Sequence, residues 1–218
     1  MAEKFSQQAL NEFDNWSKDY DHPGFFQRHL FIPTHDHIIN EMINHEKPDA
    51  TFSFLDIGCG TGTLLMRLHG KFPKATLVGV DISPGMIKMA ASKAANTPTV
   101  TFQVGNASAG LLYPDGHFDY MSCCHSFHHY PDQASALKEF RRLLNPGGKM
   151  LFVDSDINGV WGYIMHKLLI GSYEKFQVCH HKAPVLKAFL EAHGLRVERQ
   201  DRRGGWVPWM MTVAVAAP

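Results

Sequence analysis

The chain has 218 residues, 44% of them hydrophobic, so it can bury a substantial core without disulfide staples. Lysine plus arginine and aspartate plus glutamate number 21 each, which gives none of the basic excess of a nucleic-acid enzyme and predicts a small-molecule substrate. No apolar run approaches the roughly 18 residues of a membrane span, and four unpatterned cysteines without a leader-like N-terminus predict a cytoplasmic protein with free thiols.

Residues 1 to 50 precede the first predicted strand and are expected to form a helical N-terminal cap. Within it, Phe13 and Trp16 are predicted to lie on the apolar face of an amphipathic helix that packs against the sheet.

From residue 51 onward, strands alternate with helices, which is typical of a mostly parallel sheet covered on both faces. The predicted strands are Thr51–Asp56, Ala75–Val80, Val100–Val104, Phe118–Cys123, Lys149–Asp154, Arg196–Arg202 and Met210–Ala216. Helices are predicted after the first strand, from Pro84 to Ala95 and from Gln133 to Leu143. Arginines 196, 199, 202 and 203 are expected on a solvated strand edge. In such a sheet, ligands bind outside the carboxyl ends of the strands.

The first strand breaks into three glycines, Gly58, Gly60 and Gly62, before a helix begins. Glycine tolerates positive φ and has no Cβ, so the main chain there can approach a nucleotide-like ligand closely. The third glycine comes one residue too early for a dinucleotide fingerprint, and no lysine follows as in a triphosphate loop. Asp81 ends the second strand at about the 20-residue interval expected for a carboxylate that accepts ribose hydroxyls. Together these signals predict a ribonucleoside ligand.

Four ordered segments resemble motifs of the class I S-adenosylmethionine-dependent methyltransferases, in the methyltransferase type 11 group that includes the ubiquinone and menaquinone C-methyltransferases. They are Leu55–Gly62 (motif I), Val78–Ser83 (the acidic loop), Tyr113–Asp119 with Phe127–Asp132 (the fourth-strand region), and Leu144–Lys149 (the turn into the fifth strand). The resemblance implies a doubly wound, mostly parallel seven-stranded Rossmann-like α/β fold. It also implies S-adenosylmethionine as cofactor, S-adenosylhomocysteine as product, and methyl transfer to an O, N or C nucleophile of a small molecule.

On this resemblance, residues 1–218 form a single methyltransferase domain. Its parts are the N-terminal cap (1–50), a cofactor-binding core (51–155), a substrate lid (156–185) and a C-terminal helix and strand pair (186–218). The lid segment is rich in aromatic and apolar residues, so the acceptor is predicted to be apolar or aromatic, with Trp161 and Tyr163 lining its pocket. An ordinary core helix is the alternative interpretation of this stripe.

The resemblance implies ten cofactor contacts, namely Asp56, Gly58, Cys59, Gly60, Asp81, Ile82, Met86, Asn106, Ala107 and Cys124. The glycine loop would lie alongside the methionine moiety and the ribose, and Asp81 would accept hydrogen bonds from both ribose hydroxyls. Asp56 would orient the loop and reach the methionine ammonium group.

On the adenine side, the resemblance implies that Ile82 and Met86 hold the ring between them. Asn106 stands where the family more often has aspartate, so its amide oxygen would have to accept the adenine N6 hydrogen.

Two residues are candidates for catalysis. His125 directly follows the fourth predicted strand, where the type 11 group usually has an apolar residue. An unperturbed pKa of about 6.5 suits it to the role of general base, and the alternative is a histidine that only shapes the pocket. Tyr20 lies in a segment that resembles the aromatic opening of type 11 enzymes, where it would contact the methionine end of the cofactor. Plain packing of Tyr20 against the fold stays equally open.

Histidines 125, 128 and 129 form a His-x-x-His-His cluster beside two cysteines. The pair His128-His129 is ordinary for the family that the sequence resembles, and both residues are therefore interpreted as structural. Because no spaced ligand motif accompanies the cluster, no metal is predicted. The doublet His180-His181 carries little weight among 14 histidines.

Two other functional classes stay open. One is a protein that binds the cofactor without catalysis. The other is an enzyme of the same fold with non-methyl chemistry, either a rearrangement with the cofactor as bystander or a nicotinamide-dependent oxidoreductase. The early third glycine weighs against the nicotinamide version. The sequence gives no indication of the oligomeric state.

Overall fold

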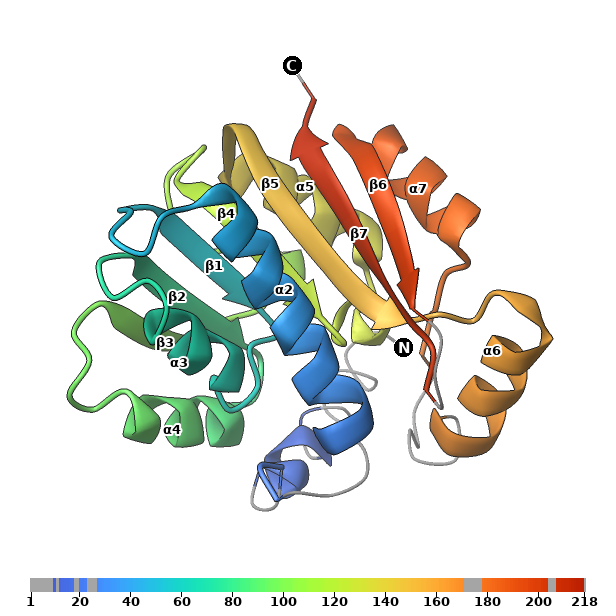
Figure 1. The fold of residues 1–218 in the computed structure, drawn as a ribbon, viewed down its shortest axis with the longest axis horizontal. Coiled ribbons are helices and arrows are strands. Elements are labelled where there is room, and N and C mark those ends of the chain that lie inside the picture. The colour runs from blue at the N-terminus through green and yellow to red at the C-terminus, as the bar shows by residue number, and fades with distance from the viewer. Residues whose placement is uncertain are drawn as a thin grey trace.

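The computed structural model describes residues 10, 12–17, 20–22, 27–170, 178–203 and 207–217. Seven strands form one sheet in the order β3-β2-β1-β4-β5-β7-β6 (Figure 1). They are β1 (Ser53–Ile57), β2 (Thr76–Asp81), β3 (Val100–Val104), β4 (Phe118–Cys124), β5 (Leu144–Ser155), β6 (Leu195–Arg203) and β7 (Trp209–Ala216). Only β7 runs antiparallel to its neighbours, β5 and β6. The predicted doubly wound, mostly parallel sheet is confirmed.

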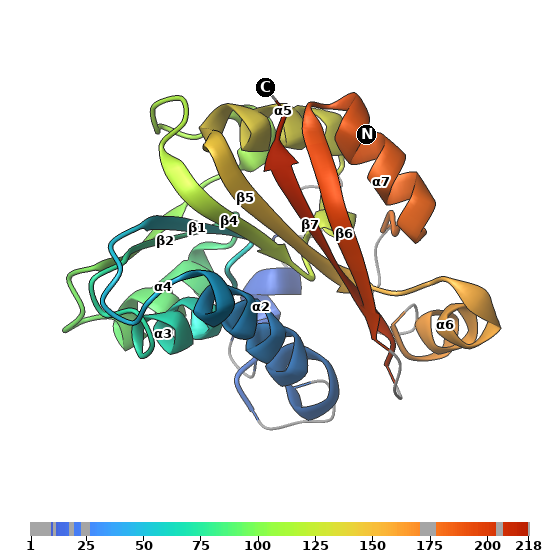
Figure 2. The ribbon, with the colours of Figure 1, turned by 45° about the horizontal axis from the view of Figure 1, so that its top comes forward.

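Helices cover both faces of this sheet, with α2, α3 and α4 on one face and α5 and α7 on the other (Figures 1 and 2). The helices are α2 (Ile32–His45), α3 (Thr63–His69), α4 (Pro84–Lys93), α5 (Gln133–Leu143), α6 (Gly159–Met165) and α7 (Ala183–Ala192). Short turns of helix are η1 (Gln27–Phe31), η2 (Ala107–Ala109), η3 (Phe127–His129) and η4 (His166–Ile170). None of these described helices is long and apolar enough to cross a bilayer.

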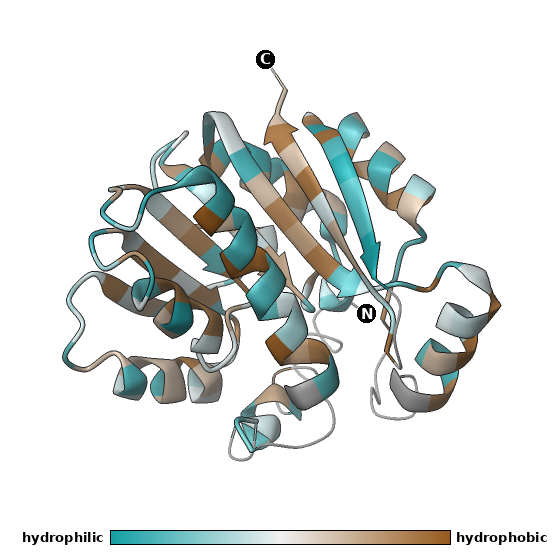
Figure 3. Cartoon of the chain, viewed as in Figure 1, coloured by the Kyte–Doolittle hydropathy of each residue, from teal (hydrophilic) through white to brown (hydrophobic). Residues whose placement is uncertain are grey.

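Two apolar clusters fill the space between the sheet and its helices. Ile38 and Met42 of α2 pack with Leu65 of α3 on one face, and Leu137 and Phe140 of α5 pack on the other. Figure 3 shows the central strands mostly in the hydrophobic colour, whereas β6 is mostly hydrophilic. Both faces of the central strands are therefore buried, as a parallel sheet between two helical layers requires.

The predicted helix starts at Pro84 and Gln133 are confirmed, and a side chain caps each helix. The Ser83 hydroxyl accepts the Met86 amide at 3.1 Å at the start of α4, and the Asp132 carboxylate accepts the Ser135 amide at 2.9 Å at the start of α5. Helix α4 ends at Lys93, so the predicted end at Ala95 was wrong by two residues.

Strand β5 begins at Leu144, well before the predicted start at Lys149. The reason is that Leu144 already pairs with Phe118 of β4, and the register then shifts before Tyr120 pairs with Lys149. The glycine-containing turn is thus an irregularity within the strand pairing rather than a connection before it.

The edge strand β6 carries the four arginines, and all four are exposed, which confirms the predicted solvated edge. Arg199 pairs with Glu41 of α2 and, at 2.8 Å, with Asp201. Arg202 pairs with Asp156 at 2.7 Å. Arg199 and Arg202 are therefore held in ion pairs with residues of the same chain.

At the N-terminus, residues 12–16 are helical. The side chains of Phe13 and Trp16 are half-buried and pack edge to face with ring centroids 5.5 Å apart, and Phe13 also contacts the ring of His129. Both side chains are less buried than expected. The helix contacts η3 at the strand ends through Phe13 and His129.

Candidate cofactor pocket

The glycine loop turns sharply out of β1. Gly58, Gly60 and Gly62 have φ of 74°, 53° and 75°, all in the left-handed region that glycine adopts without a Cβ penalty. The amides of Gly58 and Cys59 both donate to the Val80 carbonyl of β2, at 2.7 and 3.1 Å. These bonds tie the loop to the neighbouring strand end.

The three glycines differ in what surrounds them. A Cβ at Gly58 would lie 2.3 Å from the Ser126 hydroxyl, and one at Gly62 would lie 2.4 Å from the Phe102 ring. At Gly60 the nearest described atom would be in the Tyr20 ring, at 3.7 Å. The absence of a side chain therefore serves internal packing at Gly58 and Gly62, whereas a Cβ at Gly60 would meet only ordinary van der Waals contact.

Asp81 holds the two loops at this edge together. Its carboxylate accepts the Gly60 amide through one oxygen and the Ser83 amide through the other, both at 2.9 Å. Burial raises the pKa of Asp81 even though the Ser83 and Gly60 amides oppose that shift. Each oxygen keeps a second lone pair, so Asp81 can accept further hydrogen bonds while it orients Gly60.

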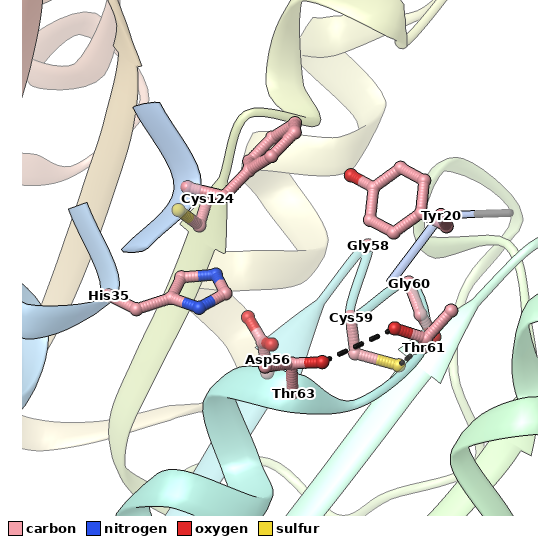
Figure 4. Close-up of a pocket in the computed structure, with 10 residues that line it drawn as sticks. Tyr20, His35, Asp56, Gly58, Cys59, Gly60, Thr61, Thr63 and Cys124 are labelled. Carbon is pink, nitrogen blue, oxygen red and sulfur yellow. Dashed lines mark hydrogen bonds between the residues drawn. The ribbon is translucent and has the colours of Figure 1, made fainter. Parts of the chain in front are cut away.

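A pocket opens where the loop faces the N-terminal cap. Its empty volume is about 410 Å³, a figure that includes open solvent at its mouth. Figure 4 shows Asp56 between His35 and the glycine loop, with Tyr20 across from His35. The lining residues are Tyr20, Phe31, His35, Asp56, Gly58, Cys59, Gly60, Thr61, Thr63 and Cys124.

Asp56 is the buried charge of this pocket, with 2% of its surface exposed. Burial raises the pKa of Asp56 to about 7, the Ser122 hydroxyl that donates to it at 2.6 Å acts in the opposite direction, and Asp81 adds to the rise. His35 is no counter-ion, because burial lowers its pKa to about 3. Within the described residues, no lysine or arginine neutralises Asp56 or Asp81.

Two aspartates of the N-terminal cap anchor it to the pocket rim. Asp14 accepts hydrogen bonds from the Ser83 hydroxyl at 2.5 Å and the Gly85 amide at 3.0 Å. Asp21 accepts the Thr61 hydroxyl at 2.7 Å and pairs with Lys93 at 2.6 Å. The cap is thereby attached to both the glycine loop and the start of α4.

His125 has a φ of 52°, the one positive value among the described non-glycine residues. Its amide donates to the Val153 carbonyl at 2.7 Å, and its Nε2 lies 3.3 Å from the Thr34 hydroxyl. Thr34 donates its own hydroxyl hydrogen to the Leu30 carbonyl, so it accepts from His125.

The predicted adenine contacts lie outside the pocket lining. Met86 and Ala107 are buried, Ile82 is half-buried, and Asn106 is exposed. The Asn106 side-chain oxygen accepts the Ser108 amide at 3.0 Å, which caps η2. Recognition of adenine by Asn106 therefore needs the second lone pair of that oxygen, and these four assignments stay predictions.

The structure brings six predicted residues together in one pocket: Tyr20, Asp56, Gly58, Cys59, Gly60 and Cys124. His125 adjoins them through Phe31, whose ring meets the imidazole edge to face at 5.5 Å. The predicted lid residues Trp161 and Tyr163 are about half exposed on α6 and do not line this pocket.

Four lining residues were not predicted from the sequence. Thr61 and Thr63 stand within and after the glycine loop, so their position was a usable signal. Phe31 and His35 come from η1 and α2, where no motif distinguishes them from an ordinary amphipathic helix.

A second polar group lies beyond the ends of β4 and β5. The Asp154 carboxylate is 2.8 Å from Nδ1 of His128 and 3.3 Å from Nδ1 of His180. Burial opposes its ionisation, but His128 and His180 hold the pKa of Asp154 well below its usual range. His128 and His180 come from two histidine doublets that the sequence analysis did not relate to each other. In the structure they are neighbours.

Comparisons with known proteins agree with this geometry. A family model described as "Methyltransferase domain" matches residues 54–148. The demethylmenaquinone methyltransferase of Deinococcus radiodurans is 35% identical over 101 residues, which are 46% of this chain and 42% of that protein. The chain thus spans less than half the length of that curated relative.

Two solved structures share the fold at 20% identity. One is a chain in the complex between the Trm112 methyltransferase activator and a methyltransferase of Haloferax volcanii, with a TM-score of 0.76 over 95% of this chain and 98% of that one. The other is magnesium protoporphyrin IX methyltransferase from Synechocystis PCC 6803 with bound S-adenosylhomocysteine, with a TM-score of 0.73 over 95% of each chain. Residues 54–148 are therefore similar to a methyltransferase domain, and the chain shares the fold of these two solved structures.

Proposed function

We propose that this protein binds S-adenosylmethionine in the pocket beside Gly60 and transfers its methyl group to a small-molecule acceptor. The observation that carries the proposal is the pair of buried carboxylates, Asp56 and Asp81, next to bare backbone at Gly60. A buried carboxylate without a cation is costly, so the pocket favours a cationic ligand.

The charges of the cofactor match this surface. S-adenosylmethionine supplies a sulfonium-activated methyl group and carries an ammonium group. Burial raises the pKa values of Cys59 and Cys124 well above the ordinary thiol range, so both lining thiols are neutral. The negative charge of the pocket wall is therefore that of Asp56, which would receive the ammonium group.

Asp81 and its neighbours would hold the nucleoside half. We assign the ribose hydroxyls to Asp81, whose backbone partners leave one lone pair on each oxygen. The adenine ring is assigned to Ile82, Met86, Asn106 and Ala107, as the family resemblance implies.

Methyl transfer requires little of the protein beyond positioning an acceptor in line with the methyl group and removing a proton. The general base is proposed to be His125, which directly follows β4 and adjoins the pocket through Phe31. Tyr20 closes the pocket over Gly60, where we propose that it contacts the methionine end.

The acceptor is proposed to be apolar or aromatic. Exposed Trp161 and Tyr163 on α6 provide aromatic surface beside the strand ends. The Deinococcus relative is named a demethylmenaquinone methyltransferase, so demethylated quinols are the first compounds to screen. Nothing in the balanced net charge calls for a nucleic-acid substrate.

The test is product analysis with S-adenosylmethionine that carries a labelled methyl group, offered with quinols, phenols and amines. The proposal predicts labelled product and stoichiometric S-adenosylhomocysteine, both reduced at limiting cofactor in Asp81→Asn and kept in the exposed control Asp49→Asn. Binding of the cofactor without transfer to any acceptor in this panel would favour the non-catalytic or non-methyl alternatives instead.

A further inference from the structure

We propose that His128, Asp154 and His180 form a binding site for a divalent first-row transition metal, with zinc(II) as the reference ion. Their ligand atoms all lie within 4.8 Å of one another. This inference is independent of the proposed methyl transfer, and it departs from the expectation that the chain holds no metal.

The three ligands come from separate parts of the fold. His128 lies in η3 after β4, Asp154 is the penultimate residue of β5, and His180 precedes α7. A backbone hydrogen bond from the Cys179 amide to the His128 carbonyl, at 2.8 Å, fixes the segment of His180 beside η3. The placement of His180 is thus set by the main chain and not only by its ring.

Interatomic distances in the group suit coordination. Nδ1 of His128 is 2.8 and 2.9 Å from the two Asp154 oxygens, and Nδ1 of His180 is 3.3 Å from one of them. Ligand atoms at about 2.0 to 2.1 Å from a tetrahedral zinc ion lie about 3.3 Å apart. Because each imidazole binds an ion in the plane of its ring, coordination by both histidines requires one of the two stacked rings to rotate.

The two imidazole rings are stacked, with centroids 4.0 Å apart and planes 20° apart, and both present Nδ1 to the same carboxylate. Two stacked imidazolium ions would repel each other, whereas two neutral rings can share one cation. The side chains of His128 and His180 are only 4% and 3% exposed, which strengthens attraction between a cation and Asp154.

The donor set selects the class of metal. Two imidazoles and one carboxylate suit zinc, iron, cobalt or nickel, whereas magnesium and calcium prefer oxygen ligands alone. Three protein ligands leave at least one coordination position for water or a ligand oxygen. The imidazole of His166 packs against His180 with ring centroids 4.2 Å apart, and so borders the site from η4.

A hydrogen-bonded trio, with Asp154 accepting from both rings, is the competing account of the same distances. Calorimetric titration with zinc chloride separates the two, using untagged protein freed of metal by a chelator. We expect one zinc ion per chain and a higher melting temperature. We also expect at least tenfold weaker binding in both His180→Ala and Asp154→Asn.

Matched controls exclude binding elsewhere. Cys179→Ser removes the exposed thiol next to His180, and His193→Ala removes a histidine that bonds the Phe189 carbonyl of α7. Both controls are expected to bind zinc like the parent protein. His180→Ala changes a residue outside the sheet, so it keeps the test decisive if Asp154→Asn fails to fold.

X-ray absorption at the zinc edge identifies the donor atoms in the parent protein. The proposal predicts imidazole nitrogen and carboxylate oxygen without sulfur. No stoichiometric binding, unchanged affinity in folded His180→Ala, or sulfur in the coordination shell would each overturn it, and the first would leave a hydrogen-bonded trio only.

Discussion

Two buried carboxylates at the same edge of the sheet lie in opposite electrostatic surroundings. Asp56, at the end of β1, has a hydroxyl donor and a second carboxylate nearby, and its pKa is raised to about 7. Asp154, at the end of β5, lies against His128 and His180, and its pKa is held low. One region needs a positive charge from a ligand, and the other already contains groups that stabilise its negative charge.

The difference shows that the fold is less stable at Asp56, where the account places a cationic ligand, than at Asp154. An ionised Asp56 destabilises the empty protein, and a cationic ligand recovers that free energy on binding. Asp154 stabilises the folded chain through its histidines. The same substitution, aspartate to asparagine, should therefore have opposite effects on folding in the two regions.

The largest effect is expected for Asp154→Asn. Neutralising this carboxylate removes the negative charge that lies against both imidazoles, so the free energy of unfolding should fall by about 3 kcal/mol at pH 7 in metal-free buffer. Urea denaturation followed by circular dichroism measures the change. Unaltered stability would mean that the histidines do not depend on Asp154.

Asp56→Asn should change stability in the opposite direction. Because the folded pKa lies above the ordinary value of 3.8, the proton stabilises the fold, and wild-type stability falls as pH rises from about 4 through 7. The variant avoids this loss and should be more stable at pH 8, on the order of 3 kcal/mol. The gain should disappear at about pH 4. A destabilised variant at pH 8 would contradict the raised pKa, and Asp49→Asn serves as the exposed control.

His125→Asn tests catalysis at the boundary between the two regions. Asparagine tolerates the left-handed backbone at this position, so the fold and cofactor affinity should be kept. Loss of a general base should lower turnover about a hundredfold. Thr34→Val, which removes the partner of Nε2 but leaves Nδ1, should have a smaller effect. Equal turnover in His125→Asn and the parent protein would eliminate this base.

The smallest effect is expected for Asp81→Asn, because the asparagine oxygen can keep one backbone partner. S-adenosylmethionine affinity should fall at least tenfold through loss of charged hydrogen bonds to the ribose. Calorimetry on the folded variant measures this directly. Undiminished affinity would remove Asp81 from the ribose site and leave it as a support for Gly60.

Local sequence signals account for the cofactor side of the molecule. Apart from the start of β5, every strand end lies within two residues of its prediction, because each strand is a short run bounded by turn residues. The loop after Ile57 was identifiable because its glycines are contiguous in sequence. That Gly58 and Gly62 serve packing depends on Ser126 and Phe102, which no local pattern reveals.

Non-local contacts explain what the sequence could not predict. Phe31 and His35 reach the pocket because α2 crosses the strand ends, although their own segment reads as an ordinary helix. His128 and His180 meet at Asp154 through chain crossings that leave no spacing motif. Residues that share one loop can be found by pattern, whereas residues brought together by topology need the fold.

The most direct test of the central claim is calorimetric titration of the metal-free protein with S-adenosylmethionine and S-adenosylhomocysteine at pH 6 and pH 8, with NAD as control. We predict micromolar binding of both sulfur nucleosides, no binding of NAD, and tighter binding at pH 8, where Asp56 is ionised. No binding of either nucleoside to the folded protein would contradict the assignment of this pocket. Equal affinity at both pH values would show that the charge of Asp56 does not contribute to binding.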